Sequence, residues 1–398
     1  MHEGLFFGPI LYMKRRLWSY LLLILIFLFS SCSTNPVSKS SQFTLVSEAQ
    51  EIEMGKRYYG PTIQSFDGQY PDLEAQAYVR RIGKKLASLS HRPNLDYEFT
   101  IVNASIPNAF ALPGGKICIT RGLLAKLDNE AELASVLGHE IGHITARHGA
   151  VAMTRQMVLG GLFTAGAIAL ETQPVSGKET LLMAGAAGLQ VVLAKYSREQ
   201  ETQADDLGLE YMMRAHYTLE GSIELFEILN RLQEREPNAM ERMLASHPQS
   251  SDRLSRARDL IESKYAVRGK PKESIEDTAE FRKISQRVKK EDPYYQLHEK
   301  GTKAAEREQW DKAIHYYKDA LKAKPNEALF HADLGYAYLR VNQLELSEQH
   351  LKQAVAYYAD FFKPNYYLGY LYRQKGDLGA SQHYFARANQ IVPGALGE

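Results

Sequence analysis

Two histidines and a glutamate stand at a spacing that suits metal-assisted chemistry. They form the run His139-Glu140-Ile141-Gly142-His143, inside a segment of helical patterning in which residues four apart share one face. Both imidazoles can then reach one divalent ion, while Glu140 stands beside the water that the ion binds. The spacing therefore predicts a zinc site with an adjacent base, and such a site needs a third protein ligand.

An acidic pair farther along the chain offers that ligand. Glu201 and Asp205 are one turn apart on a second predicted helix, for which Ser197 is the expected N-cap. We expect Glu201 to join His139 and His143 around one zinc ion per chain. Asp205 would accept the ring N–H of His139 and so fix its tautomer. Taken alone, the two carboxylates would indicate a solvated acidic face, but the upstream motif favours a metal site.

The predicted chemistry follows from the metal. With three protein ligands and one open position, zinc lowers the pKa of its bound water towards about 7. Glu140 would take the proton as the resulting hydroxide attacks a peptide carbonyl, and would return it to the leaving amine. The tetrahedral oxyanion needs a further hydrogen-bond donor. The expected reaction is hydrolysis of peptide bonds within a chain.

Hydrophobic periodicity indicates the elements that position these residues. Asn129, with Glu132 three residues later, has the order of a capping box and begins a helix that runs to about residue 147. His148 would then lie about half a turn from His139 and point away from the metal. Other helices are expected at 48–58 and 73–89, a strand at 97–102, and a hairpin of 108–112 and 116–120 around a turn at 113–115.

The first strand of that hairpin is the candidate for substrate recognition. Its residues Asn108, Ala109, Phe110 and Ala111 could pair, as an edge strand, with the backbone of an extended substrate. The second strand carries Cys118, whose apolar neighbours predict a buried thiol without a catalytic role. Two apolar stretches, 157–170 and 181–194, are too short to span a bilayer. They predict packed core helices or, alternatively, a pair that touches a membrane or covers the active site.

The N-terminus has the features of an export signal. In a chain of 398 residues, Lys14, Arg15 and Arg16 precede the apolar run 17–29, which ends just before Cys32. Small residues before this cysteine resemble a bacterial lipobox, so we expect a signal peptide at 1–32 and a lipid anchor on Cys32. A plain signal peptide or an uncleaved anchor are the alternatives. The net charge of +1 offers no basic surface for nucleic acid.

The C-terminal part of the chain repeats itself every 34 residues. Gly301, Gly335 and Gly369 recur at this period, and so do small and bulky residues in the segments that follow. This pattern resembles tetratricopeptide repeats and predicts an all-helical solenoid at 293–398. The charged segment 269–292 reads as a linker or a solvated helix. A groove that binds a peptide or helix could be lined by the tyrosines at 336, 338, 366, 367, 370 and 372.

Together these motifs resemble the gluzincin metallopeptidases of family forty-eight, over roughly residues 44–265. The resemblance includes residues 108–124, the His139 motif, Glu201 with Asp205, and Ser246-His247-Pro248 followed by Arg253. It implies an α+β, mostly helical peptidase domain at 33–268 with a small sheet. It also implies that the loop with His247 and Arg253 supplies the oxyanion donor. Alternatively, His247 occupies the fourth zinc position and keeps the enzyme latent.

The repeats narrow the resemblance to the periplasmic, BepA-like members of that family. The expected protein is a zinc endopeptidase, lipid-anchored in the periplasm at the outer membrane, that removes misassembled outer-membrane proteins. Its repeats would recruit such clients or the outer-membrane assembly machinery. The alternative is a chaperone or scaffold with a latent zinc site. Glu140 argues against this alternative, because a structural site needs no base.

Overall fold

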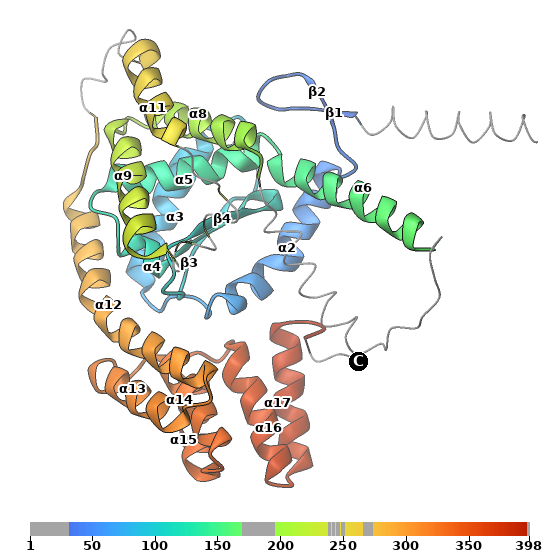
Figure 1. Cartoon of the computed structure of the whole chain (residues 1–398), viewed down its shortest axis with the longest axis vertical. Coiled ribbons are helices and arrows are strands. Elements are labelled where there is room, and N and C mark those ends of the chain that lie inside the picture. Colours follow the sequence, from blue (N-terminus) through green and yellow to red (C-terminus); the bar gives the residue numbers. More distant parts are fainter. Residues whose placement is uncertain are drawn as a thin grey trace, which may run out of the picture.

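The structure is a computed structural model that describes residues 32–168, 196–237, 240, 243, 247, 251–265 and 274–395. Within them the chain is mostly helical, with two small sheets and a C-terminal array of paired helices (Figure 1). The expected signal peptide before residue 32 and the second apolar stretch, 181–194, lie outside the described residues. No helix in these ranges is both long and apolar enough to cross a membrane.

The larger sheet has the strand order β3-β5-β4. β3 (Glu98–Val102) runs parallel to β5 (Lys116–Thr120), and β4 (Ala109–Leu112) pairs antiparallel with the other side of β5. β4 is therefore an edge strand of this sheet, as expected, and η1 (Pro113–Gly115) makes the turn between β4 and β5. Cys118 in β5 is fully buried, which confirms that this thiol is part of the core.

The two helices of the candidate site cross at small residues. α5 (Glu130–Thr145) begins at Asn129, whose side chain accepts the Glu132 N–H, and α8 (Arg198–Arg214) begins at Ser197 with a capping box. A Cβ atom at Gly142 of α5 would lie 2.9 Å from the Ala204 carbonyl oxygen of α8. Such close approach is possible only for glycine, and it brings the facing side chains of both helices to one point.

The helix that carries the histidine motif ends earlier than the sequence pattern indicates. α5 stops at Thr145, and Arg147 adopts a positive φ of 59°. The chain then turns into α6 (His148–Ile168), which leaves the body of the domain (Figure 1). His148 therefore starts a new helix. Its position cannot be extrapolated from the rotation of α5, so the prediction that it points away from the metal histidines does not hold.

The C-terminal region consists of three helical hairpins. In each hairpin, the repeat glycine of the first helix packs against a large side chain of the second. A Cβ atom added at the glycine would lie only 2.5–2.7 Å from that side chain. The pairs are Gly301 with Tyr317, Gly335 with Leu351, and Gly369 with Phe385. The 34-residue period thus corresponds to one hairpin. The paired helices are α12 (Ala279–Glu306) with α13 (Trp310–Ala323), α14 (Ala328–Arg340) with α15 (Leu344–Tyr357), and α16 (Phe362–Gln374) with α17 (Leu378–Ile391).

The described part of the expected linker, 274–292, is mostly the first half of α12. Phe281, Ile284 and Val288 are buried in the core of the peptidase region, and Ser285 donates a hydrogen bond to the Leu127 carbonyl. The charged composition reflects the other face of this helix, where Arg287 pairs with Asp72. α12 thus belongs to both regions, and the division of the chain at 269–292 stays a prediction.

The remaining elements surround this frame. The helices α2 and α3 agree with the expected segments, although α2 is longer, and the N-terminal strands β1 and β2 form an antiparallel pair. The bounds are β1 (Cys32–Thr34), β2 (Ser41–Phe43), α2 (Glu48–Ser65), α3 (Leu73–Ser88), α4 (Arg121–Leu124), α9 (Glu220–Arg235), α11 (Ser251–Leu260) and η2 (Ile261–Tyr265).

Candidate metal centre

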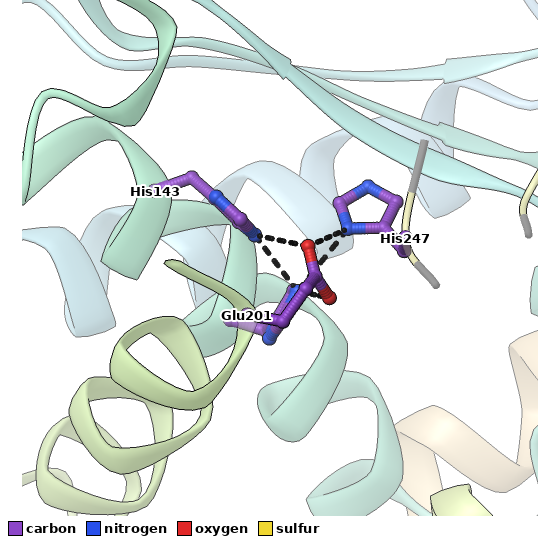
Figure 2. Close-up of side chains that lie close together, drawn as sticks. His143, Glu201 and His247 are labelled. Carbon is purple, nitrogen blue, oxygen red and sulfur yellow. Dashed lines mark hydrogen bonds and ion pairs between the residues drawn. The ribbon is translucent and has the colours of Figure 1, made fainter. Parts of the chain in front are cut away.

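Four side chains from three parts of the chain converge on one point. The ligand atoms of His139, His143, Glu201 and His247 all lie within 4.8 Å of one another. His139 Nε2 is 3.0 Å from His143 Nε2, and Glu201 Oε1 is 3.3 Å from His143 Nε2. Figure 2 shows the carboxylate of Glu201 between the rings of His143 and His247. The three expected ligands are therefore brought together, with His247 as a fourth group.

The donor atoms fit a zinc ion. His139 donates its Nδ1–H to Asp205 Oδ1 at 2.9 Å, so its Nε2 carries a lone pair that points into the cluster. Burial lowers the pKa of His143 well below its usual value, which keeps this ring neutral and able to coordinate. Neutral imidazoles and a carboxylate are the donor set that zinc prefers. His139, His143 and Glu201 would hold the ion.

Glu201 is a carboxylate although it is fully buried. Burial alone raises the pKa of Glu201, but the neighbouring His247 and His143 rings lower it below its usual range. Arg253 adds a contact of 2.9 Å between Nη1 and Glu201 Oε2. An anionic oxygen is thus maintained where a metal ligand is needed.

Arg253 occupies a different position from the one expected for an oxyanion donor. Its Nε and Nη2 donate hydrogen bonds of 2.7 Å to the two oxygens of Asp205, and its guanidinium is mostly buried. The fork geometry of arginine matches a carboxylate in this way. Arg253 therefore orients Asp205, which in turn orients His139. Its predicted catalytic role is untested, and the contacts favour a positioning role.

Glu140 stands next to the cluster with one oxygen unused. The residue is 2% exposed, and Oε2 has no hydrogen-bond partner among the described residues. Its other oxygen, Oε1, lies 3.7 Å from His247 Nε2. Burial raises the pKa of Glu140, although nearby His247 and His139 oppose the shift. A carboxyl with a raised pKa is suited to accept and return a proton.

Two residues that the sequence analysis did not assign to the site support it. His148 places Nδ1 3.0 Å from His143 Nδ1, and its Nε2 lies 3.0 Å from Gln203 Oε1. Tyr196 stacks on the His143 ring with a centroid distance of 3.8 Å. Both contacts fix the orientation of His143. Only the histidine had a signal in the sequence, and the helix break at Arg147 concealed it.

The strand expected to recognise substrate reaches the site at one residue. An apolar pocket beside His139 and Glu140 is lined by Ala109 of β4, together with side chains of α5, α8 and α9. Phe110 points to the other face of the sheet and packs on Phe66, with ring centroids 4.6 Å apart. Ala111 is buried in the main core, and Asn108 donates its backbone N–H to Thr120 Oγ1. Their role in substrate binding stays a prediction.

A helix with two metal-facing histidines, a carboxylate from a second helix and an adjacent edge strand define a domain of the metallopeptidase class. Residues 73–261 match the model of peptidase family M48, so this segment is similar to the peptidases of that family. The resemblance seen in the sequence is thereby confirmed.

The chain is similar to known metallopeptidases over part of its length. It is 32% identical to the beta-barrel assembly-enhancing protease of Yersinia pestis over 53% of this chain and 43% of that protein. It is 29% identical to the mitochondrial metalloendopeptidase OMA1 of Schizosaccharomyces pombe, over 62% of this chain and 73% of that protein. The chain thus spans less than half the length of the first relative.

A solved structure also matches part of the chain, at low similarity. MamA 41-end from Desulfovibrio magneticus RS-1 is 18% identical, covers 42% of this chain and 94% of its own, and has a TM-score of 0.26. A likeness this weak supports no conclusion about the present chain.

Proposed function

We propose that this chain is a zinc-dependent endopeptidase of the bacterial cell envelope. The observation that carries the proposal is the convergence of His139, His143 and Glu201 within a few ångströms, beside a buried carboxyl with a free oxygen. The match of residues 73–261 to a peptidase family model supports a hydrolytic role for this centre rather than a structural one.

The residues around the metal centre would have separate roles in the reaction. A bound zinc ion would supply Lewis acidity and an activated water. Glu140 would take a proton at its free oxygen Oε2 and return it to the leaving amine, because no other described group competes for that oxygen. Asp205 and Arg253 would hold His139 in one tautomer throughout. Ala109 at the edge strand would place the substrate backbone beside Glu140.

His247 supports a second feature of the proposal, a latent state. Its Nδ1 lies 3.0 Å from Glu201 Oε1 and 3.4 Å from His139 Nε2, so it sits where a fourth ligand would sit. A metal with four protein ligands has no position for water. We therefore favour the interpretation that His247 closes the site, over the interpretation that it stabilises the oxyanion. The protein would be active after this side chain has moved.

The clients and the location are inferred from the relatives and the N-terminus. The name of the Yersinia pestis relative links it to β-barrel assembly. We propose that this chain likewise degrades unfolded or misassembled outer-membrane proteins in the periplasm, anchored to the outer membrane by a lipid on Cys32. The helical hairpins would recruit clients or the assembly machinery. On them Tyr338 is buried, whereas Tyr370 is 43% exposed and available for contacts.

The variant Glu140→Gln tests the enzymatic proposal. It preserves shape and removes the base, so cleavage of an unfolded outer-membrane protein should fall by about 10²–10⁴-fold while bound zinc stays stoichiometric. Glu227→Gln, on the exposed face of α9, is the matched control and should cleave normally. Unchanged cleavage by the Glu140 variant would leave the chaperone or scaffold function as the better account.

The variant His247→Ala separates the two roles of this histidine. If His247 closes the site, its removal should raise the rate of cleavage of an unfolded substrate. If it stabilises the oxyanion, the rate should fall by about 10²–10³-fold. Zinc content measured on the same samples distinguishes both outcomes from loss of the metal.

A further inference from the structure

One helix of the peptidase region has an apolar segment that extends away from the fold. α6 leaves the body beyond the metal helix (Figure 1). Met157 and Val158 are 48% and 41% exposed, which places them among the most exposed large apolar side chains of the described residues. The backbone stays helical to residue 168. Two apolar side chains exposed side by side on a helix that projects from the fold are a candidate site of contact with a partner.

The sequence of this segment suits lipid. From 157 to 168 the chain has no charged residue and a single polar one, Thr164. Just before it, Arg155 and Gln156 are exposed. An arginine at the start of an apolar stretch is typical of the boundary between water and the bilayer, where its side chain reaches the headgroups.

The length of the segment fits one leaflet. Twelve helical residues extend about 18 Å, whereas the hydrocarbon core of a bilayer is about 30 Å thick and one leaflet is about half of that. The sequence continues this apolar run to Leu170, before Glu171, so the run is long enough to enter a leaflet and too short to cross the membrane.

The segment that follows the N-terminal anchor contacts the first turns of α6. Thr154 of α6 accepts a hydrogen bond of 2.9 Å from the Leu45 N–H, and Asn35 donates to the Ala146 carbonyl at the end of α5. Val46 is buried against α6 at Met153. The strand that begins at residue 32 is thus fixed next to the point where α6 leaves the domain (Figure 1).

We propose that residues 157–168 of α6 insert into the leaflet that carries the N-terminal anchor. Whether Cys32 is acylated or the apolar run 17–29 remains as an anchor, residue 32 is held at the lipid surface, and its contacts hold the base of α6 there too. An apolar client or a second copy of the chain would need no such proximity to the anchor. The proposal rests on the export and anchoring proposed above, and it does not depend on peptidase activity.

Insertion would set the distance of the metal centre from the membrane. α6 begins at His148, which contacts His143, and its 21 residues extend about 31 Å. The cleft would therefore stay within one helix length of the lipid surface. Chains that emerge from the membrane or fail to insert into it would be within reach, whereas soluble folded proteins would be presented less often.

The test measures contact with lipid at one position of the full chain. Val158→Cys and Leu346→Cys carry an environment-sensitive dye, in vesicles of phosphatidylethanolamine and phosphatidylglycerol that contain lipids with a quencher on the acyl chain. Both parent side chains are 41% exposed, so they are a matched pair. Cys118 is fully buried and should not react, and Cys32 is replaced by Ser in both variants if its thiol is found free.

We expect the dye at 158 to be quenched several-fold more strongly than the dye at 346. Equal quenching at both positions would overturn the proposal. A blue-shifted emission at 158 without quenching by lipid would also overturn it, since the segment would then contact protein. Cleavage of an unfolded substrate by the same samples tests the enzymatic proposal separately.

Discussion

The metal centre and the helical hairpins are built by different means. Around the metal, buried charges compensate one another: Glu201 and Asp205 face Arg253 and two imidazoles with almost no access to water. In the hairpins, the recurring contact is a glycine against a large side chain, and the repeat alanines Ala320 and Ala354 are fully buried. The contacts at the metal centre hold the reactive side chains in position, and the contacts in the hairpins set the distance between paired helices.

This difference determines what a substitution does. A buried charge is stable only with its partners, so loss of one group at the metal centre affects all the others. A hairpin contact is local, and its loss should destabilise the hairpin without a change in the chemistry. α12 packs in both regions, so a substitution in this helix can affect the metal-centre region and the hairpins together. The predictions below test the two regions and then the helix that joins them.

The largest effect is expected for Glu201→Gln. The change keeps the shape of the side chain but removes an anionic ligand, so zinc affinity should fall by more than the roughly 10–100-fold that loss of an outer partner of a ligand typically costs. Competition with a chelating dye measures this affinity. Glu199→Gln, on the exposed face of the same helix, should bind zinc normally. Normal zinc binding by both variants would exclude Glu201 as a ligand.

The next largest effect tests the joint between the two regions. Arg121 of α4 is fully buried, donates to Asp292 of α12 at 2.7 Å and lies 3.7 Å from the ring centroid of Tyr295. Asp292→Ala would leave this guanidinium buried without its carboxylate, so we expect a loss of about 3–5 kcal/mol in the free energy of unfolding.

The same helix provides the control for that measurement. Glu299 pairs with Lys303 on the exposed face of α12, and Glu299→Ala should cost less than about 1 kcal/mol. Denaturant unfolding followed by circular dichroism compares the two variants. If the Asp292 variant unfolds like the Glu299 variant, α12 does not couple the two regions and is only a connector.

The parts of the site that the sequence could predict are those that a single helix determines. His139 and His143 share a face because four residues make about one turn, and Glu201 with Asp205 follow the same rule on α8. The 34-residue period likewise predicts the hairpin contacts, because each hairpin is one repeat. Regular geometry transfers from sequence to structure without knowledge of the fold.

The features that the sequence did not predict depend on where a helix ends or on which elements pack against it. The positive φ of Arg147 ends the metal helix, so His148 lies behind His143 rather than on the far side. Arg253 binds Asp205 because α8 and α11 lie side by side, which no local pattern encodes. The charged segment before residue 293 forms a buried helix because its few apolar residues share one face.

The smallest effect is expected within the hairpins. A Cβ atom at Gly335 would lie 2.7 Å from Leu351 Cγ and 3.1 Å from the Leu351 backbone nitrogen. Gly335→Ala should therefore separate α14 from α15 and destabilise the fold by about 1–2 kcal/mol, after the better helix propensity of alanine is included. Hydrogen exchange should show the loss in these two helices, while zinc affinity stays unchanged.

A second glycine of the same region is the matched control. Gly379 lies in the first turn of α17, where the nearest atom to an added Cβ is Asp377 Oδ1 at 3.7 Å. Gly379→Ala should leave the fold as stable as before or more stable by a few tenths of a kcal/mol. If the two variants have the same stability, close packing at the repeat glycine does not hold the hairpins together. If Gly335→Ala lowers zinc affinity, the hairpins and the metal centre are coupled more tightly than their different construction implies.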